Sequence, residues 1–583
     1  MIGKLVRKMF TAQSLSALTV SVCLLIDNIM IGRHLGSDAL AANSLASPIL
    51  LILAATSSLL STGAQVACSR SLGKGSQEET NVAYSTALTV SVVFSVVFAA
   101  VIILLRVPLA RLMGAKTLLV SDTGDYMAGF AIGAPASMMA LILIPFLQIA
   151  GQSGLLIAAV LSMTVADVAL DLLNVFVFKG GMFGMGLASS LSYYIAVFIA
   201  GWYFLSKKCV FRFSFSRVKL SKLREFLAGG TPAMVGMVSS VLLVFIMNHI
   251  LLGTGSNGKM LVAVYAIITT IGNASNCVST GTAGVSLTLS GIFYNEEDRT
   301  GLRRFFSAIA CTAAAAGMAV MILLLIFAPS IVRLFISRDT QTIDMNTAVM
   351  ALRLFSIGLI PCCLNNMFRS CYQGTERVRL MDIISLTENL VSPVAVALVM
   401  RSVIGESGVW LYFCLGEFLA LIGIVAYVCV RKRGIPRCAD DYMLLRKNFG
   451  VPPEDLFEAD ARTVGDVMAA SRSAEDFCRS HGGSSRLCAH IALCVEEMGT
   501  NIVTHGFAEN KKNTLSVRLQ YKDARWTLRF RDDCTAFDPV SHVSEKIGSE
   551  SVGIRLAMRM ADEARYTYSL NLNNLTLILQ DPA

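Results

Sequence analysis

Apolar runs long enough to cross a lipid bilayer recur along most of this 583-residue chain. A helix needs about 20 apolar residues to span the hydrocarbon layer. Because lipid offers no partners for backbone polar groups, runs of this kind fold as helices, which bond those groups internally. The sequence predicts twelve transmembrane helices, near residues 10–31, 46–66, 84–105, 127–149, 154–178, 184–205, 232–255, 260–283, 305–328, 347–372, 381–400 and 408–430.

Charged residues divide the chain into two unlike parts. Only 15 % of the residues are charged, against about 25 % in soluble globular proteins. Residues 1–450 carry 34 Lys and Arg against 21 Asp and Glu, whereas residues 451–583 carry 15 against 19. We therefore expect a membrane part, a linker at 436–451 and a separate water-exposed domain at 452–583.

The distribution of Lys and Arg between the loops predicts the orientation in the membrane. With the N-terminus in the cytoplasm, the inside loops hold most of these cations, including seven between Lys207 and Arg224. Cytoplasmic loops carry such an excess, and an even number of crossings returns the C-terminus to the same side. The basic start is similar to a signal peptide, but Asp27 interrupts its apolar run, so we interpret it as a retained helix. The prediction is a multi-pass plasma-membrane protein with both termini cytoplasmic.

The membrane part consists of two similar halves, divided by the loop near 206–230. The stretch VPLARLMGA at 107–115 recurs as PSIVRLFIS at 329–337. Each half, 1–218 and 219–435, has six predicted crossings, so the repeats keep the same orientation in the membrane. This pattern favours two six-helix bundles that face each other across a cavity.

Three aspartates lie within apolar runs of the first half, where an ionised side chain is costly unless it faces a cavity or a partner. Asp27 lies in the first run, and Asp167 and Asp171 lie four residues apart on one helix face. Carboxylates that converge from two helices are suited to hold a proton or a sodium ion. Asn174 and Ser189 are candidate neutral oxygen ligands beside them.

Two further acids, Glu388 and Glu417, lie inside apolar runs of the second half. The alternative interpretation is that each intramembrane acid bonds a neighbouring backbone group or arginine, or lies near a helix end. The 15 cysteines show no paired ligand spacing, so we expect free thiols packed as small apolar groups.

The membrane part contains the stretches LIDNIMIGRHLGSDALAANSLASP, STGAQVACSRSLGKG and GVWLYFCLGEFLAL, in this order. These motifs resemble those of the multidrug and toxic compound extrusion (MATE) family of cation-coupled antiporters, and the resemblance covers about residues 5–435. It implies export of small cationic or amphipathic substrates in exchange for H⁺ or Na⁺. It also implies that Asp27 binds the coupling ion and that Asp171 belongs to an Asn-x-x-x-Asp pattern, in which Asp167 here replaces the asparagine.

The tail after residue 451 has the pattern of an α+β sandwich. A linker and a first edge strand are expected within RKNFGVPPEDLFEAD, helices at 462–480, 485–506 and 553–562, and strands at TLSVRLQY, RWTLRFRDD, RYTYSLNL and LTLILQ. Glu497, Asn501 and His505 recur every four residues and therefore share one face of the second helix. The alternative interpretation of that line is a solvated helix face.

Three tail motifs, CVEEMGTNIVTHGF, FRDDCTAFDP and SVGIRLAMRMADEARY, resemble the gyrase, Hsp90, histidine kinase and MutL (GHKL) ATP-binding fold, in particular its anti-sigma-factor kinase branch. The resemblance implies ATP and Mg²⁺ as cofactors. It assigns Mg²⁺ to Asn501, the general base to Glu497 and the adenine amino group to Asp532. Gly553 remains at the start of the phosphate-facing helix. His505, on the second helix, is also expected to contact the cofactor.

The glycines depart from the family pattern. Cys534 and Ala536 occupy glycine positions after the second strand, and Glu550 and Ser551 replace glycines before the third helix. Because backbone amides approach phosphate closely only where side chains are absent, nucleotide binding is favoured over catalysis.

We predict an ion-coupled efflux antiporter with a regulatory nucleotide-binding domain. One alternative is a lipid-linked saccharide flippase of the same superfamily. The other is a membrane sensor whose tail is a serine kinase acting on a STAS-type or other regulatory protein partner. Membrane lipid is an expected partner, and nucleic acid is not.

Overall fold

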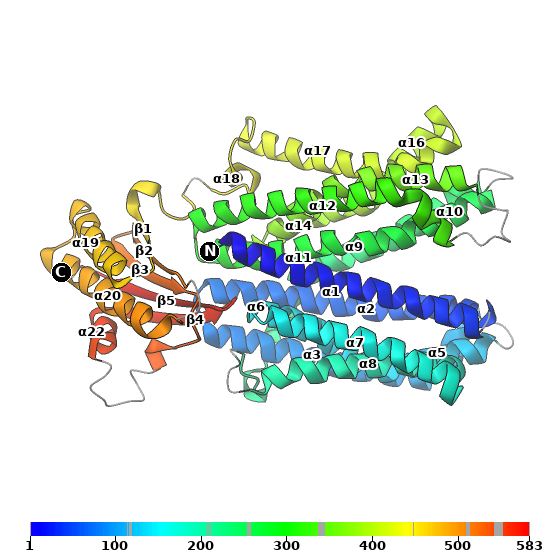
Figure 1. Ribbon diagram of the computed structural model, residues 1–583, viewed down its shortest axis with the longest axis horizontal. Helices are drawn as coiled ribbons and strands as arrows, with labels where there is room; N and C mark the ends of the chain where they lie inside the picture. Colours follow the sequence, from blue (N-terminus) through cyan, green and yellow to red (C-terminus); the bar gives the residue numbers. More distant parts are fainter. Residues whose placement is uncertain are drawn as a thin grey trace.

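A computed structural model describes residues 2–35, 37–113, 115, 119–206, 209, 211–253, 258–335, 344–446, 448–508, 513–541 and 552–581. It contains a long helical bundle, with a five-stranded sheet domain at one end (Figure 1). The helical class of the membrane part and a separate C-terminal α+β domain, both predicted from the sequence, are confirmed. The antiparallel pairing of the sheet is a finding of the structure.

The N-terminal lobe contains the first half of the helices. They are α1 Ile2–Met30, α2 Ser37–Gly73, α3 Gln77–Leu104, α4 Arg106–Leu112, α5 Leu119–Ile132, α6 Ala134–Ile149, α7 Ser153–Leu173 and α8 Gly181–Phe204. Two π-helical segments, η1 Ile31–Leu35 and η2 Asn174–Phe178, extend α1 and α7.

The C-terminal lobe contains the second half. Its helices are α9 Ser221–Leu252, α10 Gly258–Ser275, α11 Cys277–Asn295, α12 Arg299–Phe335, α13 Met345–Ile357, α14 Leu359–Gly374, α15 Val378–Leu386, α16 Ser392–Ile404 and α17 Tyr412–Lys432. The π segment η5 Thr387–Val391 joins α15 to α16, and the 3-10 segment η6 Glu406–Leu411 precedes α17.

Within the described residues, nine helices or continuous helix pairs are long and apolar enough to cross a membrane, and eleven are if each of two bent pairs counts as one span. The sequence predicts twelve, and α1, the first of them, packs along the bundle against α7 and α11. The bent pair α5 and α6 turns by 48° at Gly133. A Cβ at Gly133 would lie 2.5 Å from Ser190, so the bend brings two backbones into contact where only glycine fits.

The two lobes pack closely in the half of the bundle next to the sheet domain (Figure 1). A Cβ on Gly63 of α2 would lie only 2.0 Å from the Phe226 carbonyl oxygen of α9. The Gln65 amide of α2 donates a hydrogen bond of 2.8 Å to the Thr288 hydroxyl of α11. This end of the interlobe space is therefore closed by direct helix contacts.

The predicted linker is packed against the membrane part. It contains the short helix α18, Ala439–Tyr442, and the Tyr372 hydroxyl of α14 donates to the Tyr442 carbonyl oxygen at 2.7 Å. Met443 is buried in the C-terminal lobe's hydrophobic cluster with Phe306 and Phe368. The segment that carries the C-terminal domain is thus held in place by the C-terminal lobe.

The C-terminal domain is a sheet covered on one face by helices. Its strands are β1 Leu456–Ala461, β2 Leu515–Lys522, β3 Arg525–Asp532, β4 Glu563–Ser569 and β5 Leu572–Leu579, in the antiparallel order β1-β2-β3-β5-β4. The helices are α19 Val464–Ser480, α20 Ser485–Asn501 and α22 Val552–Met560, with the π segment η8 Ile502–Gly506 after α20. Alternate residues of β3 such as Trp526 and Phe530 enter the core beneath these helices.

Candidate functional site

A cluster of three acids lies inside the N-terminal lobe, as the sequence predicts. Ligand atoms of Cys23, Asp27 and Asp167 all lie within 4.8 Å of one another. The Cys23 thiol donates to Asp167 Oδ2 at 2.8 Å, and the Asp27 carboxyl faces both Asp167 and Asp171 of α7. Asp167 and Asp171 are buried, at 4 % and 0 % exposed.

Several oxygens of this cluster have no hydrogen-bond donor among the described residues. They are Asp27 Oδ1, Asp167 Oδ1 and both carboxyl oxygens of Asp171. No described Lys, Arg or His forms an ion pair with any of the three aspartates. Since neighbouring carboxylates in a low-dielectric interior cannot all be ionised without compensation, the cluster requires protons or a bound cation.

Cys23 is a member of this cluster that the sequence interpretation missed. All 15 cysteines are free, but this thiol contacts a carboxylate and is not a mere apolar filler. Its signal in the sequence is the spacing Cys23 to Asp27, which is one helical turn on the same face of α1.

Asn174 has a local structural role. Its Oδ1 accepts a hydrogen bond from the Gly180 N–H at 3.1 Å, and its Nδ2 donates to the Gly181 carbonyl at 3.1 Å. Both ends of its amide therefore hold the turn between η2 and α8, which argues against the predicted role as an ion ligand. Ser189, half-buried on α8, remains a predicted ligand.

A second buried cluster lies in the C-terminal lobe, where ligand atoms of Cys362, Glu388 and Glu417 approach within 4.8 Å of one another. Both glutamates are buried, at 3 % and 4 % exposed. Polar residues of α14 bind them: Asn365 donates to Glu417 Oε2 at 2.8 Å and Asn366 donates to Glu388 Oε1 at 3.1 Å.

Arg369 makes this second cluster electrostatically different from the first. Its guanidinium pairs with Glu388 Oε2 at 3.5 Å, so one of the two carboxylates has a cationic partner. For Glu388 the arginine partner anticipated by the alternative interpretation is therefore present. The signal for these partners is the polar stretch NNMFR, residues 365–369, within an otherwise apolar run.

The predicted nucleotide residues come from α20, α22 and the end of β3. Asn501 ends α20, and its Nδ2 donates to the Glu497 carbonyl oxygen at 2.9 Å. The Glu497 carboxylate packs directly on Gly553 at the start of α22, where a Cβ would lie 1.9 Å from Glu497 Oε2. Gly553 thus allows α22 to approach the acid of α20.

Asp532 ends β3 and faces the core. Its Oδ1 accepts hydrogen bonds from the Cys534 N–H at 3.0 Å and from Asn573 Nδ2 at 2.7 Å. Burial raises the pKa of the Asp532 carboxyl above its ordinary value, partly offset by the Asn573 bond. A buried acid with fixed orientation suits the edge of a purine, so the residues fit a nucleotide at its adenine end.

His505 and the segment before α22 are the remaining parts of the predicted nucleotide site. His505 is exposed in η8, the π segment that follows Asn501. Its predicted contact with a cofactor stays a prediction. Glu550 and Ser551 lie outside the described residues.

The open face of the C-terminal sheet is docked on the membrane part. On this face Arg518 pairs with Asp298 at 2.6 Å, and Arg531 pairs with Glu296 at 2.6 Å. Both acids belong to the docking loop, residues 296–298 between α11 and α12. Because Arg518 and Arg529 are directly opposite across two strands, the loop supplies the negative charge that these like charges require.

The tip of the β4–β5 hairpin, Leu570 and Asn571, contacts both lobes. The Leu570 N–H donates to the Ile149 carbonyl oxygen of α6 at 2.7 Å, and Asn571 Nδ2 donates to the Gly151 carbonyl at 2.9 Å. The Leu570 side chain is buried in a hydrophobic cluster that includes Met9 of α1 and Phe293 of α11. The hairpin tip therefore connects the lobes where they meet.

Two facing helical lobes with buried carboxylates define a membrane transporter, and the comparisons with known proteins agree. Residues 13–173 and 232–399, more than half of the chain, match the MatE family model. The chain belongs to the MatE family. Residues 458–579 match the model described as histidine kinase-like ATPase domain.

Two curated relatives carry names that refer to multidrug export or multidrug resistance. The Multidrug export protein MepA of Staphylococcus saprophyticus is 23 % identical over 401 residues, which cover 68 % of this chain and 87 % of that protein. The Probable multidrug resistance protein YoeA of Bacillus subtilis is 24 % identical over 360 residues, covering 59 % and 74 %.

Solved structures share the fold of the membrane part. A crystal structure of MATE in complex with MaL6 has a TM-score of 0.69 at 22 % identity and covers 74 % of this chain and 96 % of its own. A MOP superfamily transporter from Pyrococcus furiosus has a TM-score of 0.67 at 23 % identity, covering 74 % and 95 %.

Proposed function

We propose that this protein exports small cationic or amphipathic compounds in exchange for H⁺ or Na⁺. The observation that carries the proposal is the cluster of Asp27, Asp167 and Asp171, whose buried oxygens have no cationic partner among the described residues. The names of the two exporter relatives support the substrate class. The loop charges support cytoplasmic termini, with the C-terminal domain on the cytoplasmic side.

The exchange follows from the cost of uncompensated charge in the lobe. When the cluster is empty and ionised, mutual repulsion of its carboxylates favours a cationic ligand or a rearranged helix packing. A proton or Na⁺ removes that charge, so the ion and a cationic substrate favour different states of the lobe. Ion entry then drives substrate exit.

The C-terminal domain is proposed to regulate this exchange. Its sheet is paired with the docking loop of one lobe and its hairpin tip is bonded to the other. The lobes separate at this end only if one of these contact sets breaks, so the strength of docking sets access from that side.

A nucleotide is the proposed regulatory signal. The match to the histidine kinase-like ATPase domain supports it. Asp532 would bond adenine and Asn501 would hold Mg²⁺, with Glu497 as the expected general base. ATP would supply negative charge. The chain's own contribution is strand β3, which links Asp532 at its end to Arg531 on the docked sheet face.

The coupling is tested in proteoliposomes that contain the full chain and a fluorescent cationic dye. An imposed proton or sodium gradient should drive dye movement, and Asp27→Asn should abolish it while leaving protein level and fold unchanged. Asp476→Asn, at an exposed site on α19, serves as the matched control. Gradient-driven transport that persists in Asp27→Asn would contradict the proposal.

Regulation is tested in the same vesicles by adding Mg-ATP on the side of the C-terminal domain. The export rate should change with ATP, and Asp532→Ala and Asn501→Ala should remove that response without changing basal export. Asp460→Ala, exposed on β1, is the control. An ATP-insensitive wild type would contradict the regulatory role, and phosphate transfer to a serine of a partner protein would favour the sensor kinase.

A further inference from the structure

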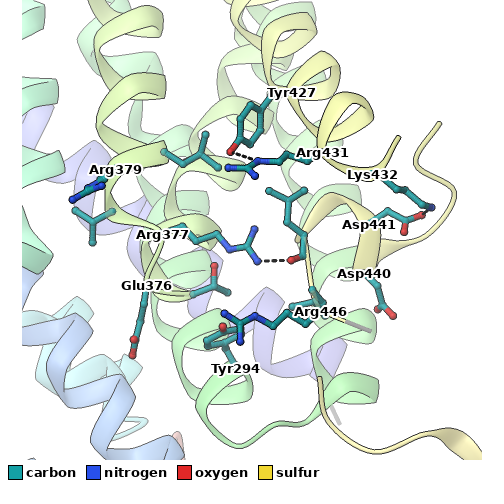
Figure 2. A pocket seen from close by; sticks show the side chains of 15 residues that line it. Tyr294, Glu376, Arg377, Arg379, Tyr427, Arg431, Lys432, Asp440, Asp441 and Arg446 are labelled. Carbon is teal, nitrogen blue, oxygen red and sulfur yellow. Dashed lines mark hydrogen bonds and ion pairs between the residues drawn. The ribbon is translucent and has the colours of Figure 1, made fainter. Parts of the chain in front are cut away.

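A large basic cavity lies at the end of the C-terminal lobe, beside the segment that leads to the C-terminal domain. Its volume is about 980 Å³, and fifteen residues line it (Figure 2). They come from the end of α11, the turn between α14 and α15, the last turn of α17, and α18 with the residues after it. The cavity is separate from both carboxylate clusters and from the predicted nucleotide residues.

Three guanidinium groups converge on this cavity from three different segments. Figure 2 shows Arg377, Arg431 and Arg446 directed toward its middle. Arg377 donates to the Leu444 carbonyl oxygen, and Arg431 Nε donates to the Tyr427 hydroxyl at 3.0 Å. Among the described residues, no carboxylate forms an ion pair with any of the three.

The acids that line the cavity are already neutralised by other cations. Glu376 and Asp440 point away from its middle (Figure 2). Glu376 pairs with Arg70 at 2.9 Å, and Asp440 pairs with Arg299 at 2.7 Å. Asp441, the third acid, pairs with Lys432. The positive charge of the three convergent arginines is therefore not compensated within the described protein.

The surroundings make the charge of half-buried Arg377 unfavourable in the absence of a ligand, whereas Arg431 and Arg446 reach the cavity from exposed positions. Burial, with repulsion from Arg446, lowers the pKa of the Arg377 guanidinium. An anion in the cavity would meet positive charge from three segments, and planar guanidinium pairs bidentately with phosphate.

The position of the cavity matches the boundary between lipid and water. Arg377 directly precedes the span that begins at Val378, and Arg431 lies in the last turn of the span that ends at Lys432. Apolar side chains of Val378 and Leu380 lie on the same wall. Basic pockets at such a boundary bind phosphate headgroups of anionic lipids.

We propose that this cavity is a binding site for a phosphate-bearing anion, either an anionic lipid headgroup or a soluble phosphate compound. Its walls are the α14–α15 turn on one side and the chain around α18 on the other, so the bound anion ties the linker to the lobe. The site would thereby hold the segment that positions the C-terminal domain.

The experiment uses the full chain, purified in detergent, and Arg431→Gln/Arg446→Gln as the variant. Native mass spectrometry measures retention of phosphatidylglycerol against phosphatidylcholine, and a thermal shift titration with inorganic pyrophosphate measures soluble phosphate. The matched control is Arg224→Gln/Arg437→Gln, which removes two exposed arginines from outside the cavity.

We expect at least a tenfold loss of one anion's binding in the variant and no loss in the control. Loss of phosphatidylglycerol alone identifies a lipid site, and loss of the pyrophosphate shift alone identifies a soluble ligand. Equal binding by wild type and variant in both arms, or an equal loss in the control, would overturn the proposal. Far-ultraviolet circular dichroism checks that the variant is folded.

Discussion

The backbone N–H of Leu570 lies 2.7 Å from the carbonyl oxygen of Ile149, which joins the C-terminal domain to the N-terminal lobe. The side chain of the same leucine is buried in a hydrophobic cluster formed mainly by residues of the C-terminal lobe, together with Val6 and Met9 of α1. One residue of a β-hairpin thus touches both lobes at their junction. A tail attached to one lobe only could not couple its own state to their separation.

Gly151 should be essential for this docking. It has a φ of +76°, which favours glycine, and a Cβ would lie 2.4 Å from the Asn571 backbone nitrogen. We expect Gly151→Val to release the hairpin tip and increase protease cleavage between the membrane part and the C-terminal domain. Gly154→Val is the control, because nothing lies within 4 Å of a Cβ there. Unchanged cleavage in Gly151→Val would contradict the role of the tip.

The pair of Arg531 and Glu296 should be a strong docking contact. Their side chains are 13 % and 7 % exposed, and removing one partner of a buried ion pair costs about 3 kcal/mol. Glu296→Arg should therefore undock the domain, and Arg531→Glu in the same chain should restore part of the contact. Spin-label distances between α3 and α19 report the docking. The ion pair between Lys522 and Glu297 is more exposed, so disrupting it should change the free energy of docking by less than about 1 kcal/mol.

Docking should weaken in acid through Asp298. Burial alone would raise the pKa of this carboxyl, but Arg518, Arg531 and the Gly301 N–H outweigh burial and lower it below 3.8. Because docking lowers the pKa of this carboxyl, the ionised group stabilises the docked state at any pH above the pKa of the undocked state. This stabilisation is lost as the pH falls through the pKa of the docked state. Docking should therefore be constant above about pH 4 and weaken below it.

Asp298→Asn should remove most of this acid dependence and weaken docking at neutral pH. Asp298 caps α12 by accepting a hydrogen bond from the Gly301 N–H, and asparagine caps helices equally well. The change in docking therefore reports the loss of the negative charge of Asp298. The same spin-label distances, measured from pH 6 to pH 3, provide the test. Identical acid profiles for wild type and variant would show that other groups control the transition.

Cys23 should tune the ion cluster as a hydrogen-bond donor to Asp167. Cys23→Ser keeps a donor, whereas Cys23→Val removes it at similar volume. A hydrogen bond to a charged group contributes about 1.5 kcal/mol or more, so Cys23→Val should shift the ion concentration for half-maximal transport about tenfold. Cys311→Val, at an exposed site on α12, is the control. Equal shifts for Ser and Val would argue that only packing matters.

The locations of the helices and of the acids were predictable because they depend on local sequence. Lipid accepts only long apolar segments, so the runs containing Asp27 and Asp171 indicate both a helix and a buried charge. The strands of the C-terminal domain were equally predictable, because alternation along RWTLRFRD sorts Trp526 and Phe530 to one face and Arg529 and Arg531 to the other. Breaks such as the bend at Gly133 were not, because they depend on a neighbouring helix.

By itself, the sequence determined which segments enter lipid, which carry buried acids and which alternate as strands, since each of these is set by the solvent that a short segment meets. Only the tertiary structure decided that Cys23 bonds Asp167, that Asn174 holds a turn, and that the sheet arginines meet Glu296 and Asp298. Those contacts join residues more than a hundred positions apart or depend on one backbone turn. No local periodicity encodes which distant surfaces have matching shape and charge.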